Sequence, residues 1–121
     1  MKPILRLTFA LALLATLLLA ADISGKWKGT LTGADQERPL TFDLTVKADT
    51  VTGTVAGLAD HALEVKDGKV TGDVVTFWVQ SEYQGQPVKL MYKGQISGSE
   101  IHFNISNEEG SWSTDLVAKK S

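Results

Sequence analysis

The sequence predicts an all-β fold, an antiparallel up-and-down barrel of about eight strands, for most of this 121-residue chain. After residue 22, apolar and polar residues alternate with period two in most segments, as in strands with one buried face. Turn residues separate these segments at short intervals. The connections are too short for helical crossovers, so neighbouring strands must be antiparallel.

The first 21 residues are expected to be removed from the mature protein. A basic start with Lys2 and Arg6 is followed by a Leu- and Ala-rich run over residues 7–19 and then by Ala20 and Ala21. This order is typical of a secretory signal peptide, and the run is shorter than the ~20 residues of a membrane span. We therefore expect a secreted or periplasmic protein with a single barrel domain over the remaining residues, 22–121, and no membrane span.

Charge and cysteine content exclude several function classes. The formal net charge of −2 becomes −4 when Lys2 and Arg6 leave with the signal peptide, which argues against a nucleic-acid partner. The absence of cysteine excludes a disulfide framework, a thiolate zinc site and a cysteine nucleophile. The exported domain, which we expect to be a monomer, must therefore be held together by its core alone.

The individual strands follow from the alternation. Its clearest apolar positions are Trp27, Gly29 and Leu31, then Leu40, Phe42, Leu44 and Val46, then Val75, Phe77 and Val79, then Val88, Leu90 and Tyr92, and finally Ile101, Phe103 and Ile105. β-Branched and aromatic residues, which strands prefer, fill these runs. Turn signals between them lie at 33–35, 48–49, 57–60, 72–73, 84–87, 98–99 and 108–110. The expected strands cover 23–32, 39–47, 50–56, 62–71, 74–83, 87–97, 100–106 and 111–119.

The fourth predicted strand is interrupted at Asp67-Gly68. Val65 lies at an odd position and Val70 at an even one, so a regular strand would place them on opposite faces. A β-bulge at the interruption would return them to one face, and a two-residue hairpin is the alternative. We also expect the first and last strands to pair, because closure removes both exposed edges.

The segment Gly25-Lys26-Trp27 resembles the Gly-x-Trp motif that opens the first strand of lipocalins and the wider calycin group. This resemblance implies a small lipocalin-like barrel. Lipocalins carry an arginine near the last strand that packs on the tryptophan, and in this chain Lys119 and Lys120 stand in that region. The segment is also similar to uncharacterised β-modules of exported bacterial proteins, for which no ligand is implied.

Ser24 to Trp27 is also similar to the start of small periplasmic protease inhibitors. These are eight-stranded barrels that block a metalloprotease with their N-terminal segment. Their longer N-terminal arm and usual disulfide are not matched in this chain, in which only Asp22 and Ile23 precede the motif after processing.

Aromatic residues are the candidate ligand contacts. Strand parity points six of them inward, namely Trp27, Phe42, Phe77, Tyr83, Tyr92 and Phe103, and Trp112 is expected to join them. An eight-stranded barrel is either filled by such side chains or holds one small ligand. In the second case, Tyr83 and Tyr92 would supply polar tips to an apolar pocket at one mouth.

A second candidate surface lies outside the barrel. Trp78 and Met91 point outward by parity, on two strands that are neighbours in a hairpin. Together with Lys89 or Lys93 they could form a docking spot for an exported protein or a carbohydrate. The alternative is a single tryptophan covered by a lysine stem.

The sequence contains no recognisable catalytic constellation. His61 and His102 lie on different elements, and no third ligand with metal-site spacing accompanies them. No nucleophile elbow or phosphate loop is present. Carboxylates on polar faces are expected to be solvated charges rather than a glycosidase pair, namely Asp43, Glu64, Glu82 and Glu100. We expect no enzyme activity, no cofactor and no metal.

These observations predict an exported binding module that takes a small hydrophobic ligand or a partner protein at the barrel mouth. Two alternatives remain open. One is an interaction protein similar to the periplasmic protease inhibitors, and the other is a structural or accessory domain whose filled core takes no ligand.

Overall fold

The computed structural model describes residues 22–32 and 37–121. The predicted signal peptide, residues 1–21, and the predicted turn at 33–35 lie outside the described residues. Within the described ranges, no helix is long and apolar enough to cross a membrane. The strands are β1 (Gly25–Thr32), β2 (Glu37–Lys47), β3 (Thr50–Ala56), β4 (Leu63–Glu64), β5 (Lys66–Thr71), β6 (Val74–Tyr83), β7 (Gln86–Ser97), β8 (Glu100–Asn107) and β9 (Ser113–Lys120).

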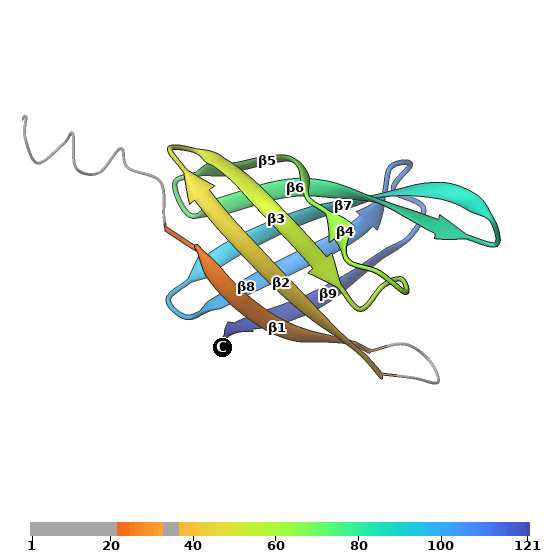
Figure 1. The fold of residues 1–121 in the computed structure, drawn as a ribbon, viewed down its shortest axis with the longest axis horizontal. Helices are drawn as coiled ribbons and strands as arrows, with labels where there is room; N and C mark the ends of the chain where they lie inside the picture. The colour runs from red at the N-terminus through yellow and green to blue at the C-terminus, as the bar shows by residue number, and fades with distance from the viewer. Residues whose placement is uncertain (1–21, 33–36) are drawn as a thin grey trace, which may run out of the picture.

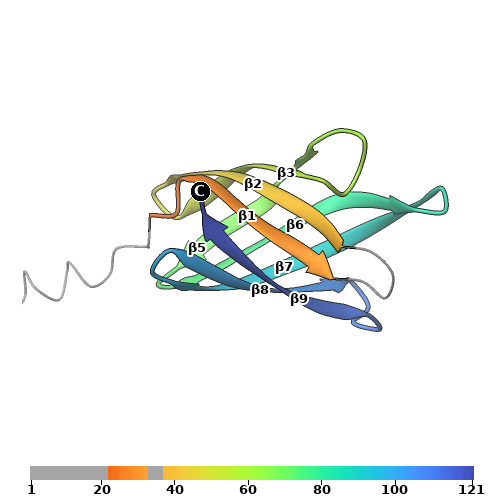
Figure 2. The same cartoon turned by 90° about the horizontal axis from the view of Figure 1, so that it is seen from below.

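These strands form one closed antiparallel barrel (Figures 1 and 2). β2 pairs with both β1 and β3, and β9 returns to pair with β1 at Trp27–Lys120 and Lys28–Lys119. The short strand β4 and the following β5 both pair with β3, so together they count as one strand of an eight-stranded barrel. The predicted up-and-down barrel and its closure through the first and last strands are confirmed.

A β-bulge explains the interruption in the fourth predicted strand. The register between β5 and β6 shifts between Lys66 and Lys69, and Asp67 takes a left-handed φ of 52°. Val65 and Val70, on either side of the shift, are both buried. The extra residue therefore returns the apolar side chains to the inner face, and the hairpin alternative is wrong.

The residues that precede β1 cover one end of the barrel. Ile23 is buried, and its carbonyl accepts a 2.9 Å hydrogen bond from Nε1 of Trp27. The hydroxyl of Ser24 accepts a 2.9 Å bond from the backbone N–H of Val46, and its carbonyl accepts a 2.6 Å bond from Nζ of Lys120. This short segment is therefore bonded to β1, β2 and β9.

Lys120 also packs on the buried tryptophan. Its Nζ lies 5.2 Å from the centroid of the Trp27 ring, within the range of a cation–π interaction. Lys119, the neighbouring candidate, is exposed and pairs with Lys28 in the register of β1 and β9. Of the two candidate lysines, Lys120 is therefore the one that packs on the tryptophan.

Four aromatic rings fill the middle of the barrel. Phe77 and Tyr92 stack with centroids 4.7 Å apart, and Phe42 stacks at 5.0 Å on Phe103. The two stacks meet edge to face, with Phe42 6.0 Å from Tyr92 and Phe77 5.8 Å from Phe103. Offset stacks and edge-to-face contacts at these distances are favourable aromatic geometries. The rings thus span the interior from strands on opposite sides.

Gly94 makes room for these rings. It lies opposite Phe103 in the register of β7 and β8, and a Cβ at this position would come within 2.8 Å of the Phe103 ring and 2.6 Å of Ile101. Only glycine therefore lets Phe103 lie against the backbone of β7.

Candidate binding site at the open end of the barrel

Five of the six aromatic residues predicted to contact a ligand lie inside this core. All five are at most 3% exposed: Trp27, Phe42, Phe77, Tyr92 and Phe103. Their rings contact one another or, for Trp27, the segment that closes the barrel, so they hold the fold together. The structure thus brings these residues together, and does so by filling the interior with side chains.

Tyr83 is the exception among the six, because it has inward parity but is not buried. Its side chain is 68% exposed. Parity does turn it toward the inner side of β6, but the hairpin of β6 and β7 projects beyond the barrel wall (Figure 1). No opposing strand covers the ring there, so it stands over the open end.

Trp112, also expected to point inward, is 48% exposed. It shares the parity of the buried residues Leu116 and Ala118, but β9 begins only at Ser113. Alternation holds only where the chain is extended, and Trp112 belongs to the loop before the strand. Its ring therefore lies at the barrel mouth.

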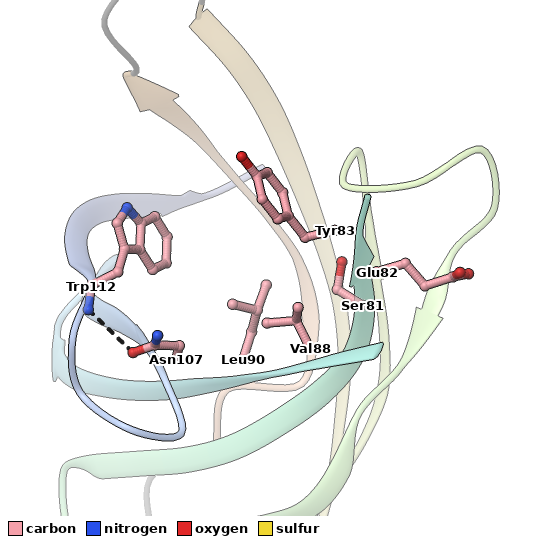
Figure 3. Close-up of a pocket in the computed structure, with 7 residues that line it drawn as sticks. All are labelled: Ser81, Glu82, Tyr83, Val88, Leu90, Asn107 and Trp112. Atoms are coloured by element: carbon pink, nitrogen blue, oxygen red, sulfur yellow. Dashed lines mark hydrogen bonds between the residues drawn. The ribbon is translucent and has the colours of Figure 1, made fainter. Parts of the chain in front are cut away.

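Tyr83 and Trp112 lie on two sides of one hollow, with Val88 and Leu90 as its apolar floor (Figure 3). The hollow has a volume of about 500 Å³, within the roughly 300–1,000 Å³ of small-molecule sites. Its lining residues are Ser81, Glu82, Tyr83, Val88, Leu90, Asn107 and Trp112. In Figure 3 the Glu82 carboxylate is turned away from the space between the two rings. The hollow is therefore mainly aromatic and aliphatic.

Asn107 holds the loop that carries Trp112. Its Oδ1 accepts a 3.2 Å bond from the backbone N–H of Trp112, and its own N–H donates a 3.2 Å bond to the Trp112 carbonyl. Its Nδ2 donates to the hydroxyl of Ser111 at 2.8 Å, and its carbonyl accepts from the N–H of Gly110 at 3.1 Å. One residue thus pins both ends of residues 107–112 and fixes the base of the Trp112 side chain.

The second predicted surface is brought together as expected, but Trp78 is engaged within the protein. Trp78 and Met91 are directly opposite in the register of β6 and β7. The indole Nε1 of Trp78 donates a 2.7 Å hydrogen bond to Asp67, and Nζ of Lys89 lies 4.4 Å from the ring centroid. The indole is half-buried under this lysine, and it anchors the bulge at Asp67.

The histidines and carboxylates do not converge. His61 lies 2.7 Å from Asp60 in the loop after β3, and this hydrogen bond lowers the pKa of Asp60 below its usual range. His102 lies 3.0 Å from Glu100 on the outer wall. Within the part of the chain that the structure describes, no three His, Cys, Asp or Glu side chains are placed to hold a metal ion.

The remaining predicted carboxylates are spread over the barrel. Asp43 lies on the outer face of β2, opposite Lys26 in the register of β1. Glu64 pairs with Lys66 at 3.2 Å, and Glu82 lies at the open end, far along the barrel from Glu100. Each occupies a separate region of the barrel wall or rim, so the structure assembles no carboxylate pair from them.

The hollow includes residues that the sequence did not point to, namely Asn107 and Ser81. The signal for Trp112 was present but needed a different interpretation, because a tryptophan directly after Glu-Glu-Gly-Ser is more naturally a loop residue than a strand residue. The role of Asn107 depends on the closed loop and has no counterpart in strand periodicity.

No family model matches the chain, and no curated protein or solved structure matches it.

Proposed function

We propose that this protein is an exported, non-catalytic binding protein that takes a small apolar ligand in the hollow at the open end of the barrel. The observation that carries the proposal is the pair of exposed rings, Tyr83 and Trp112, above an apolar floor of Val88 and Leu90. When a ligand covers large aromatic side chains that are exposed to water at a concave site, the burial of their apolar surface favours binding.

The fixed placement of Trp112 supports this proposal. Asn107 holds the Trp112 backbone through two hydrogen bonds. Side chains held in place lose little conformational freedom when they bind, so more of the contact energy becomes affinity. The filled core below the hollow means that the ligand binds at the mouth instead of entering the barrel.

Export is the second part of the proposal. The basic start, the apolar run and the two alanines of residues 1–21 are typical of a secretory signal. Because the barrel closes through its own strands and the chain has no cysteine, its stability does not depend on disulfide formation, so it can fold in an oxidising compartment outside the cytosol.

The protease-inhibitor alternative has less support. It needs an N-terminal segment free to reach a partner's active site, whereas Ile23 is buried and Ser24 bonds to both β2 and Lys120. The outer surface at Trp78 and Met91 remains the place where a partner protein would dock if the mouth takes no ligand.

Titration with the neutral fluorophore N-phenyl-1-naphthylamine tests the proposed function. We expect saturable binding with an enhanced emission, and a loss of affinity of about tenfold or more in Trp112→Ala and Tyr83→Ala. Val117→Ala, which shortens a side chain 41% exposed on the outer wall, is the matched control and should bind normally. Absence of saturable binding, or an equal loss in the control, would rule out the mouth as the site.

A further inference from the structure

We propose that the mouth site selects organic cations with an apolar body, of the quaternary-ammonium amphiphile type, over neutral and anionic ligands of the same size. This inference rests on the proposed function and adds the charge of the ligand. It is carried by the chemistry of the two rings and by the charges around them.

The three tryptophans of the protein show which ring is still open to a cation. Trp27 has the ammonium of Lys120 at 5.2 Å from its ring, and Trp78 has that of Lys89 at 4.4 Å. Among the described residues no lysine or arginine lies over the ring of Trp112. Its π-face is thus available to a ligand cation, and Tyr83 on the other side of the hollow offers a second one.

Acidic residues dominate the described part of this end of the barrel. The loops and strand ends that meet there carry five carboxylates against two cations, Arg38 and Lys89. The carboxylates are Glu37, Asp60, Glu82, Glu108 and Glu109. Of these, Glu82 lines the hollow itself, whereas Glu108 and Glu109 lie in the loop before Trp112 and also line the neighbouring outer surface with Lys89 and Lys93. Charges of one sign around a concave site raise the local concentration of ligands of the opposite sign.

The two cations, Arg38 and Lys89, already interact with other groups of the protein. Nη1 of Arg38 donates to the carbonyl of Leu58 at 3.2 Å, and Lys89 lies 3.7 Å from Glu108 and over the Trp78 ring. Glu109 has no ion pair among the described residues. The formal charge of the described residues at this end is therefore negative, which favours a positive headgroup over a negative one.

The shape of the hollow decides how such a ligand would lie. The apolar body would cover Val88 and Leu90, and the charged group would lie between Tyr83 and Trp112, open to water and near the acidic rim. Aromatic rings bind quaternary ammonium groups in this way because those groups are weakly hydrated and cannot hydrogen-bond. A carboxylate or sulfonate in the same place would meet the negative faces of both rings.

Three fluorescent probes of one shape test the inference: diphenylhexatriene, its trimethylammonium derivative and its propionic acid derivative. Fluorescence anisotropy titrations of the mature protein should give an affinity for the cationic probe about fivefold to tenfold above the neutral one, with the anionic probe weakest. In about 1 M salt, where screening acts within ~3 Å, the part of this preference that is due to the acidic rim should be lost.

Two variants locate the preference. Trp112→Leu keeps an apolar side chain and removes the π-face, so binding of the neutral probe should persist while the cationic preference falls to about twofold or less. Glu108→Gln with Glu109→Gln should lower the cationic preference about threefold. The matched control, Asp73→Asn with Glu100→Gln, removes two carboxylates from the opposite end and should leave the preference unchanged.

The outcomes separate this inference from the proposed function. If the neutral probe binds in the hollow but the cationic probe binds no better, the charge selectivity is wrong and the proposed function stands. If no probe binds saturably, both fail. A cationic preference that survives in both mouth variants, or that falls equally in the control, would place the cation elsewhere and overturn the inference.

Discussion

The ammonium of Lys120 lies 5.2 Å from the centre of the Trp27 ring while it donates a 2.6 Å hydrogen bond to the Ser24 carbonyl. The last strand is thereby joined to the first by a side chain as well as by the backbone ladder. The same tryptophan bonds to the carbonyl of Ile23, so one cluster closes the barrel wall and covers its end.

The first prediction concerns the tryptophan of this cluster. Trp27→Ala should lower the free energy of unfolding by about 3–5 kcal/mol, because it removes a large core side chain and leaves a cavity. Chemical denaturation measures this, with Trp112→Ala, at an exposed position, expected to cost under about 1 kcal/mol. Equal midpoints for Trp27→Ala and the unmodified protein would contradict the core role of Trp27.

Tyr92→Phe should stabilise the protein. The Tyr92 ring is 2% exposed within the aromatic stack, and its hydroxyl has no hydrogen-bond partner among the described residues. Removal of an unsatisfied buried polar atom should raise the free energy of unfolding by about 1 kcal/mol. Thermal and urea denaturation would measure the change, and a destabilisation of similar size would indicate that the hydroxyl binds a buried water.

The stability of the protein should also fall in alkaline solution through the same residue. Burial raises the pKa of Tyr92 above its ordinary value of 10.0, so the folded state keeps the proton that the unfolded state releases. This contribution to stability is complete below pH 10 and is lost above it, by up to about 1.4 kcal/mol per pH unit. Urea denaturation from pH 9 to 11 should show this slope in the unmodified protein and a smaller one in Tyr92→Phe; parallel slopes would contradict it.

Asn107→Ala should weaken ligand binding with little effect on the fold. The change removes the side-chain bonds to Trp112 and Ser111, which lie in an exposed loop. Looser placement of Trp112 should lower the affinity for N-phenyl-1-naphthylamine about fivefold, the equivalent of one hydrogen bond of about 1 kcal/mol. The melting temperature should change by only a few degrees, and Asn104→Ala on the outer wall is the control. An unchanged affinity would mean that the loop is held by other contacts.

Gly94→Ala should destabilise the barrel by about 1–3 kcal/mol. The added methyl would meet Ile101 and the Phe103 ring at less than 3 Å, so the stack would have to move. Denaturant midpoints and near-UV circular dichroism would report the loss and the displaced rings. Gly29→Ala, which would meet a flexible Leu116 side chain but also the Val117 carbonyl, should be destabilising as well.

Strand positions were predictable because they depend on local pattern. The expected second and sixth strands, 39–47 and 87–97, differ from β2 and β7 only by one or two residues at their starts. The bulge near Asp67 followed from the change of parity between Val65 and Val70. Five buried rings were likewise placed on the correct face, because alternation in a strand determines its two faces.

The candidate site was harder to predict, because exposure depends on what lies opposite a side chain. Tyr83 has inward parity, but its hairpin projects beyond the wall, and Trp112 has the parity of a strand that begins one residue later. Asn107 became important only when the loop of residues 107–112 closed on it. None of these relations can be deduced from the period-two alternation of a strand.

The sequence by itself determined the barrel, its strand order and the aromatic content of its core, since turn chemistry and period-two alternation act over a few residues. Only the tertiary structure decided that the core rings fill the interior and that Tyr83 and Trp112 meet at one mouth. The physical reason is that both outcomes depend on distances between strands far apart in the chain, which barrel closure sets.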